Sequence, residues 1–123
     1  TYMNIFLQKQ ARSFRNAFRG IVVAIQQETH CKIHLLATIA VIVLGILLHI
    51  ALNEWIVIFI CIAMVWCLEL INTAIENIVD MVSPERQERA RNIKDIAAGA
   101  VLFAAICSVI IACLIFIPKI ISW

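Results

Sequence analysis

The amino-acid sequence predicts an all-α integral membrane protein, with an N-terminal amphipathic surface helix followed by three transmembrane helices. Hydrophobic residues make up 63% of the 123 positions, which is above the share found in ordinary soluble domains. These residues gather into three apolar runs that, with their flanks, reach the length of a membrane span. We find no linker, low-complexity tract or internal repeat, so one domain is expected over residues 1–123.

The surface helix is predicted over residues 3–30. Its apolar side chains share one face, and its arginines lie on roughly the opposite face. A helix of this kind lies in the membrane interface and does not cross the bilayer. Two roles stay open: a simple anchor on anionic lipid, or an anchor whose arginines also contact a phosphate group. The residues concerned are Phe14, Phe18, Ile21 and Ile25 on the apolar face, and Arg12, Arg15 and Arg19 on the basic face.

Three polar residues that could bind a ligand lie near the end of this helix. Glu28 lies at the edge of the apolar face, within roughly 40° of Phe14, and its spacing alone favours a cap or a surface charge. His30 and His34 are four residues apart, a spacing that suits metal binding if a third ligand is present. No such ligand follows at a defined spacing, so no zinc site is expected.

The first two spans are predicted at residues 33–52 and 55–80. Asn53 and Glu54 form a very short turn between them. Trp55 begins the second span and suits an interfacial anchor, because indole rings favour the headgroup level of a bilayer.

A cytoplasmic connection is predicted at residues 81–93 and the third span at 94–117. Within the connection, residues 83–85 have the pattern of a helix start, with Ser as N-cap, Pro in the first position and an acid in the first turn. Pro118 is expected to end the third span. Small residues every four positions would let this helix approach another closely: Ala100, Ala104, Ser108 and Ala112.

A polar stripe runs along the end of the second span, made of Glu69, Asn72, Glu76 and Asp80. At 100° per residue these four positions fall within roughly 80° of one helix face. Counted from Trp55, Glu69 lies about 21 Å into a hydrocarbon core of about 30 Å. The stripe therefore straddles the second interface, and ionisable groups at such depth are functional candidates.

The basic residues set the orientation. They gather before the first span and in the 81–93 connection, whereas the turn at residues 53–54 has none. Because cytoplasmic loops carry an excess of Lys and Arg, the N-terminus and that connection are predicted to be cytoplasmic. The stripe, Glu28 and the arginines then meet at the same cytoplasmic interface.

The residue types at this interface suit phosphoryl transfer to a lipid alcohol. Two carboxylates can hold Mg²⁺ and leave coordination positions for substrate phosphates, a third can accept a proton from an attacking hydroxyl, and Lys94, near a helix start, can stabilise phosphoryl charge. The sequence has neither G-x-x-x-x-G-K-[ST] nor G-x-G-x-x-G, so a nucleotide site would lack a glycine-rich phosphate loop. Two non-enzymatic functions stay open: a proton or cation pathway along the stripe, and an assembly subunit that packs other membrane proteins.

The run E-L-I-N-T-A-I-E-N-I-V-D at 69–80, followed by K-D-I-A-A-G-A-V-L at 94–102, resembles the prokaryotic diacylglycerol kinase and undecaprenol kinase family. The resemblance extends over nearly the whole chain in the order and spacing of its helices. It implies a small homotrimeric enzyme of the bacterial inner membrane that uses MgATP at sites built between neighbouring subunits. No nucleic-acid partner is expected.

By position, the resemblance also assigns roles. Glu28, contrary to its reading as a cap, and Glu76 match the metal-binding acids, and Glu69 matches the catalytic carboxylate, the candidate general base. Asn72 and Asp95 match supporting polar residues, and Lys94 matches the lysine that contacts the transferred phosphate. Positions near the nucleotide are matched by Arg12, Arg19 and Glu85.

Two positions are less clear, and the lipid stays open. Asp80 is interpreted as structural, and Gln87 stands where relatives often carry His. The K-I-H run at 32–34 and I-A-A-G-A-V-L at 96–102 resemble the Gram-positive undecaprenol kinase branch. Undecaprenol is therefore the favoured acceptor, and diacylglycerol, which would give phosphatidic acid, is the alternative.

Overall fold

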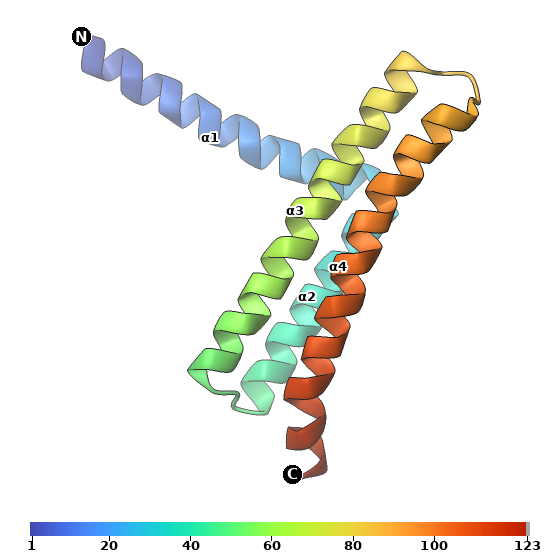
Figure 1. The fold of residues 1–123 in the computed structure, drawn as a ribbon. Coiled ribbons are helices and arrows are strands. Elements are labelled where there is room, and N and C mark those ends of the chain that lie inside the picture. The colour runs from blue at the N-terminus through green and yellow to red at the C-terminus, as the bar shows by residue number, and fades with distance from the viewer. Residues whose placement is uncertain (123) are drawn as a thin grey trace.

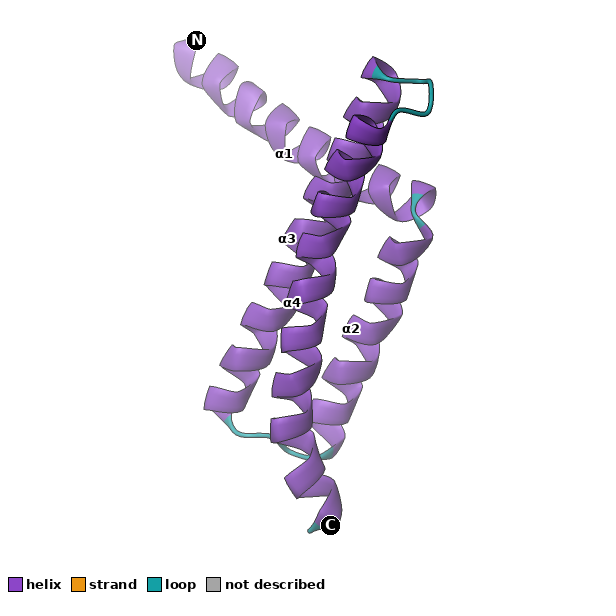
Figure 2. Ribbon diagram, turned by 45° about the vertical axis from the view of Figure 1, so that its right-hand side comes forward, coloured by secondary structure: helices purple, strands orange, loops and turns teal. Residues whose placement is uncertain are grey.

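The computed structural model describes residues 1–122, which form helices joined by short loops. Its four helices are α1 (Tyr2–Gln27), α2 (Thr29–Leu47), α3 (Leu52–Val82) and α4 (Glu88–Ile121). Helices α2, α3 and α4 run side by side, whereas α1 projects away from them and meets the bundle only at its C-terminal end (Figures 1 and 2). The predicted all-helical class is confirmed.

Three of the helices are long and apolar enough to cross a membrane. They contain 19, 31 and 34 residues, with mean hydropathies of 2.0, 2.3 and 3.1 over their most apolar windows for α2, α3 and α4 respectively. At 1.5 Å per residue, α3 is about 46 Å long and α4 about 51 Å, more than a hydrocarbon core of about 30 Å requires. The polar ends of these two helices therefore extend beyond the apolar region.

The main apolar core lies at the end of the bundle where α2 turns into α3. Ile50, Ile58 and Phe116 are buried there. Gly45 of α2 lies directly against the indole of Trp55, and a Cβ at this glycine would be 2.6 Å from the Trp55 ring. Trp55 packs half-buried against α2, and its expected place at the membrane interface stays a prediction.

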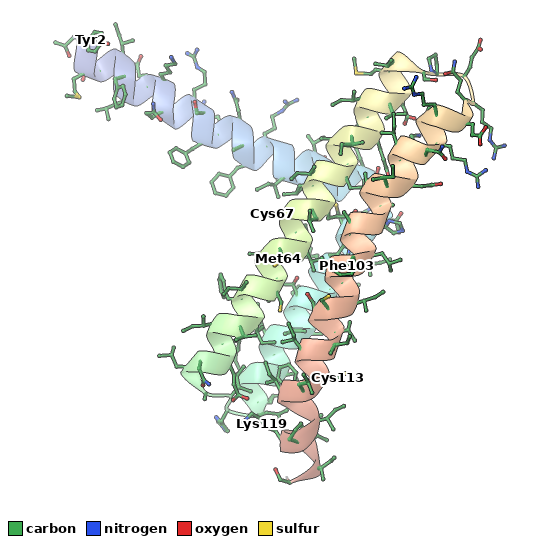
Figure 3. All side chains as sticks on the ribbon, viewed as in Figure 1. Tyr2, Met64, Cys67, Phe103, Cys113 and Lys119 are labelled. Atoms are coloured by element: carbon green, nitrogen blue, oxygen red, sulfur yellow. The ribbon has the colours of Figure 1, made fainter. Side chains whose placement is uncertain are left out.

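The outward faces of the bundle remain apolar. Phe59, Phe103 and Leu114 are 71%, 73% and 71% exposed, and Figure 3 shows Met64 on α3 and Phe103 on α4 extending away from the helices. Surfaces of this kind are costly in water and stable against lipid chains or other apolar helices.

The small residues of α4 contribute to packing within the chain. Helix α4 makes its most extensive contacts with α3, and Ala104 is buried while Ala112 packs against the apolar core. Ala100 is exposed, so the predicted stripe of small residues is only partly covered within a single chain.

The predicted turn at residues 53–54 is displaced in the structure. The chain turns at 48–51, where His49 has a φ of 51°, and Asn53 and Glu54 belong to the first turn of α3. The cause is a cap: Glu54 Oε1 accepts a hydrogen bond from the backbone N–H of Ala51 at 2.9 Å, which satisfies a donor at the helix N-terminus.

The predicted helix start at residues 83–85 is wrong. Ser83 is the C-cap of α3, its backbone N–H donating to the Val79 carbonyl at 2.8 Å, and its hydroxyl donates to the Glu85 carbonyl at 3.1 Å. Helix α4 begins at Glu88 after Gln87 as N-cap, so Lys94 lies in its second turn and not at a helix start.

Pro118 does not end α4, contrary to the prediction. The helix continues through it to Ile121. A proline removes one backbone N–H from the helix, and the last turn gains a tertiary contact in compensation, because Lys119 Nζ lies 3.1 Å from Glu54 Oε1.

Candidate active site

The α1–α2 junction brings Glu28 to the bundle. The backbone of Glu28 is extended, with φ −112° and ψ 124°, so the helix predicted to reach residue 30 ends at Gln27. The Glu28 side chain is half-buried and makes no capping hydrogen bond to either helix. An acid that is partly removed from water without a cap function is available to bind a ligand.

The polar stripe of α3 becomes more exposed toward the C-terminal end of the helix. Glu69 and Asn72 are 2% and 5% exposed, Glu76 is half-buried, and the Asp80 side chain is 63% exposed. Burying a carboxylate as fully as Glu69 is expensive unless it is partnered. The stripe thus leads from solvent at Asp80 to an enclosed acid at Glu69.

Asn72 connects two members of this stripe. Its Nδ2 donates to Glu76 Oε1 at 3.2 Å. Its Oδ1 is buried and has no hydrogen-bond partner within the described residues. A buried acceptor without a partner costs free energy, and the cost is removed when a bound ligand supplies a donor or a cation.

The acids of the junction and of α3 interact electrostatically. The pKa of Glu28 is raised above its ordinary value, first by burial, and then by the negative charge of Glu76 and, less strongly, of Glu69. Nearby His30 acts in the opposite direction. Like charges in proximity disfavour ionisation, and a divalent cation among them would relieve that repulsion.

His34 faces the Glu69 carboxylate, with 3.3 Å between His34 Nε2 and Glu69 Oε2. The sequence indicated this histidine as a possible metal ligand paired with His30 and as part of the K-I-H run, and not as a partner of Glu69. A groove of about 240 Å³ opens beside the pair. Helix α2 contributes His30 and His34 to it, α3 contributes Glu69 and Asn72, and α4 contributes an apolar wall from Ala98 to Ala105.

A second groove, of about 400 Å³, lies at the loop between α3 and α4. Lys94 forms an ion pair with Asp80 there, and Glu85 and Asp95 also line it. Asp95 is exposed and lies 3.8 Å from the Nε of Arg91. Asp80 is one helical turn from Glu76, so this polar groove continues the stripe toward solvent.

Arg12 and Arg19 are not brought to these grooves within one chain. Both are exposed on α1, and neither lines the groove beside Glu69 or the groove at the α3–α4 loop. The part of α1 that meets α3 is its C-terminal end, where Ala24 and Gln27 lie close to Thr73 and Asn77.

The residues present suit Mg²⁺ held jointly with a substrate. Within residues 1–122 no group of three or more His, Cys, Asp or Glu side chains is arranged to hold a metal ion. Glu28 and Glu76 supply two carboxylates, and the unpartnered Oδ1 of Asn72 lies beside them. Mg²⁺ in phosphoryl-transfer sites is typically held by one or two carboxylates together with substrate phosphates and water.

Taken together, the fold and these grooves define a class: a helical membrane protein with an acidic site at one end of its spans. Comparison with known proteins identifies the family. The sequence profile described as prokaryotic diacylglycerol kinase matches residues 15–116. The chain belongs to this family, and it is a lipid kinase.

The chain is similar to two curated relatives that are named for different activities. The chain is 41% identical over 113 residues to an undecaprenol kinase from Bacillus subtilis, which covers 92% of each protein. It is 39% identical over 111 residues to a diacylglycerol kinase from Synechocystis, which covers 89% of this chain and 63% of that protein. The prediction of a lipid kinase is confirmed, and a kinase of this family uses ATP.

Proposed function

We propose that this chain transfers the γ-phosphoryl group of ATP, with Mg²⁺, to the hydroxyl of undecaprenol at the cytoplasmic face of the bacterial inner membrane. The observation that carries the proposal is the enclosed carboxylate of Glu69, which faces a groove next to the acids Glu28 and Glu76. A base beside a metal-binding pair is what phosphoryl transfer to an alcohol requires.

Glu28 and Glu76 are the proposed ligands of Mg²⁺, which when bound would neutralise the phosphate charge. Asn72 holds Glu76 in place through their hydrogen bond. Lys94 would exchange its partner Asp80 for a phosphate oxygen of the nucleotide. Glu85 and Asp95 line the same groove and would contact the remainder of the nucleotide.

Glu69 is the proposed general base. Its carboxylate takes the proton from the lipid hydroxyl as the hydroxyl oxygen forms a bond to the γ-phosphorus. The bond between that phosphorus and the β,γ-bridging oxygen breaks, and ADP leaves with the electron pair. General base catalysis of this kind contributes typically ~10²–10⁴-fold to a rate.

The cavities beside Glu69 suit a lipid acceptor. A further cavity, of about 160 Å³, lies among α2, α3 and α4. It shares His34 and Ala105 with the groove that Glu69 lines. Its other walls are mostly apolar, including Val41, Ile62 and Val109. A hydroxyl beside Glu69 would thus have its hydrocarbon chain in an apolar space further into the bundle.

The undecaprenol kinase from Bacillus subtilis supports undecaprenol as the acceptor, since it matches this chain over 92% of both lengths. The diacylglycerol kinase from Synechocystis supports the alternative acceptor, diacylglycerol. The K-I-H run at 32–34 places His34 in the groove itself, so the motif that favours the undecaprenol branch is part of the proposed acceptor site.

A homotrimer is proposed as the active assembly. The exposed apolar faces of α3 and α4 leave surface for neighbouring subunits, and the outlying Arg12 and Arg19 would reach a nucleotide only if α1 met another chain. Helix α1 would lie along the cytoplasmic interface, its Phe14 and Phe18, each 67% exposed, inserted among lipid chains.

The test is an assay of radiolabelled ATP with undecaprenol and diacylglycerol side by side in mixed micelles. We expect phosphorylation of undecaprenol in preference, a requirement for Mg²⁺, and loss of activity by ~10²–10⁴-fold in Glu69→Gln. Preference for diacylglycerol would overturn the acceptor assignment. Full activity of a trimeric Glu69→Gln variant would overturn the assignment of the base.

A further inference from the structure

The enclosed carboxylate of Glu69 is held from one side by an imidazole. His34 lies on α2 and Glu69 on α3, 35 positions later in the sequence, and their side chains are 3.3 Å apart between Nε2 and Oε2. Glu69 is 2% exposed, and the His34 side chain is 19% exposed. Because water is largely excluded, the electrostatic attraction between the two groups is stronger than on a surface.

The imidazole is itself fixed in place. Its ring packs edge-on against Trp66, with centroids 6.5 Å apart and an interplanar angle of 64°. Trp66 Nε1 donates to Thr38 Oγ1 at 2.9 Å, and that hydroxyl donates to the His34 carbonyl at 2.7 Å. The hydrogen bonds therefore connect the Trp66 ring on α3 to the turn of α2 that carries His34, and the imidazole packs against the ring that they hold.

The pair also lies at the groove proposed for the lipid acceptor. His34 and Glu69 line the same groove of about 240 Å³, and the contact with His34 engages Oε2. The other carboxylate oxygen, Oε1, then remains for the proton of the incoming hydroxyl. A neutral imidazole with its proton on Nε2 and an imidazolium both carry the N–H that a hydrogen bond to Oε2 needs.

We propose that His34 is a positioning residue for the phosphoryl transfer, donating from Nε2 to Glu69 Oε2 so that Oε1 is presented to the lipid hydroxyl. The inference rests on the proposed role of Glu69 as the base. It assigns to His34 no contact with the nucleotide. The geometry of the base, and not the affinity for ATP, is what His34 controls, so its loss lowers kcat and leaves the KM for ATP unchanged.

The test compares two substitutions at His34 in the assembled protein. His34→Leu removes the donor and lowers kcat by roughly 10- to 100-fold, the scale expected when a reacting group is misplaced by about 1 Å. His34→Gln places an amide N–H in a similar position and restores most of kcat. The control is His49→Asn at the opposite end of the bundle, since Asn tolerates the positive φ found there. It keeps full activity.

Folding is followed separately, by thermal unfolding in detergent. A His34→Leu variant with unchanged kcat overturns the inference, and so does an equal loss of kcat in His34→Leu and His34→Gln. A rise in the KM for ATP with kcat retained overturns it as well. Glu69→Gln is assayed in parallel. If it retains full activity, the proposed base is wrong; if it is inactive while His34→Leu is fully active, only the role of His34 is wrong.

Discussion

Both ends of the helical bundle contain a buried or half-buried glutamate on α3. The two ends differ in the partners that they provide for its carboxylate. At the end where α2 turns into α3, Glu54 accepts the backbone N–H of Ala51 at 2.9 Å and pairs with Lys119 at 3.1 Å. At the other end, Glu69, Glu76 and Glu28 approach one another, and within residues 1–122 none of the three forms an ion pair with a lysine or arginine.

The two environments differ in how far the polar groups are satisfied. The Glu54 end closes over the apolar core of Ile50, Ile58 and Phe116, and its one acid has two partners. At the opposite end, the pKa of the Glu28 carboxyl is raised by burial and then by neighbouring acids. The amide oxygen of Asn72 there has no hydrogen-bond partner within the described residues. Unsatisfied groups of this kind are costly in a folded protein, so the second end is organised for a ligand and the first for stability.

The largest expected effect comes from removing one acid at each end. Glu76→Gln deletes a proposed Mg²⁺ ligand, and several kcal/mol of charge stabilisation correspond to a loss of activity of roughly 10²-fold or more. The matched variant Glu54→Gln keeps an acceptor for the Ala51 N–H and keeps activity. Lipid phosphorylation by the purified protein measures both. Equal activity of the two variants would contradict the assignment of the ligand site to the Glu76 end and of a stabilising role to the Glu54 end.

A smaller effect is expected from overpacking the apolar end. In Gly45→Leu the new side chain meets Trp55, whose ring lies 2.6 Å from the position of a Cβ, so stability falls by about 1–3 kcal/mol. Gly20→Leu on α1 meets nothing within 4 Å and serves as the control. Thermal unfolding followed by circular dichroism measures both. Equal melting temperatures would show that the α2–α3 contact is not tightly packed.

At the acidic end, Glu28→Gln is expected to raise stability slightly in the absence of Mg²⁺. The pKa of Glu28 is raised in the folded protein, so the folded state holds this proton more tightly than the unfolded state. The stabilisation is fully present below the ordinary value of 4.5 and is lost as the pH rises through the folded value. A glutamine at position 28 does not ionise, so the Glu28→Gln variant does not lose this stabilisation at neutral pH.

The same variant should lose the stabilisation that Mg²⁺ gives to the wild type, because a ligand that binds only the folded state raises its stability. Melting temperatures with and without Mg²⁺, at acidic and neutral pH, test both statements. Unaltered stabilisation by Mg²⁺ in Glu28→Gln would mean that Glu28 is not a ligand.

The sequence was sufficient to predict three long apolar helices, because hydropathy is a local property of each run. It was less successful at the helix ends, where a few hydrogen bonds decide the boundary. The Ala51–Glu54 cap moved the turn to residues 48–51, and the contact of Lys119 with Glu54 supports a helical turn beyond Pro118. Tertiary contacts of this sort have no signature in a single sequence.

In the candidate site, too, features within one helix could be predicted from the sequence, and contacts between helices could not. The stripe on α3 could be predicted, since Glu69, Asn72 and Glu76 follow one helical periodicity. The contact between His34 and Glu69 could not, because it joins two helices, and the i, i+4 spacing of His30 and His34 suggested only a metal pair. Nor did the spacing of Glu28 indicate its proximity to Glu76, which depends on the extended backbone at the α1–α2 junction.

The smallest effect is expected at the ion pair that closes the apolar end. Lys119 and Glu54 are 32% and 21% exposed, and ion pairs with access to water contribute ~0.2–1 kcal/mol. Lys119→Met should therefore lower the melting temperature only slightly, and less so at high salt. Adding Glu54→Gln should cost less than the sum of the two single changes, since both remove the same contact. Strictly additive losses would show that the two residues act independently, and Glu54 would then stabilise α3 through its cap to Ala51 alone.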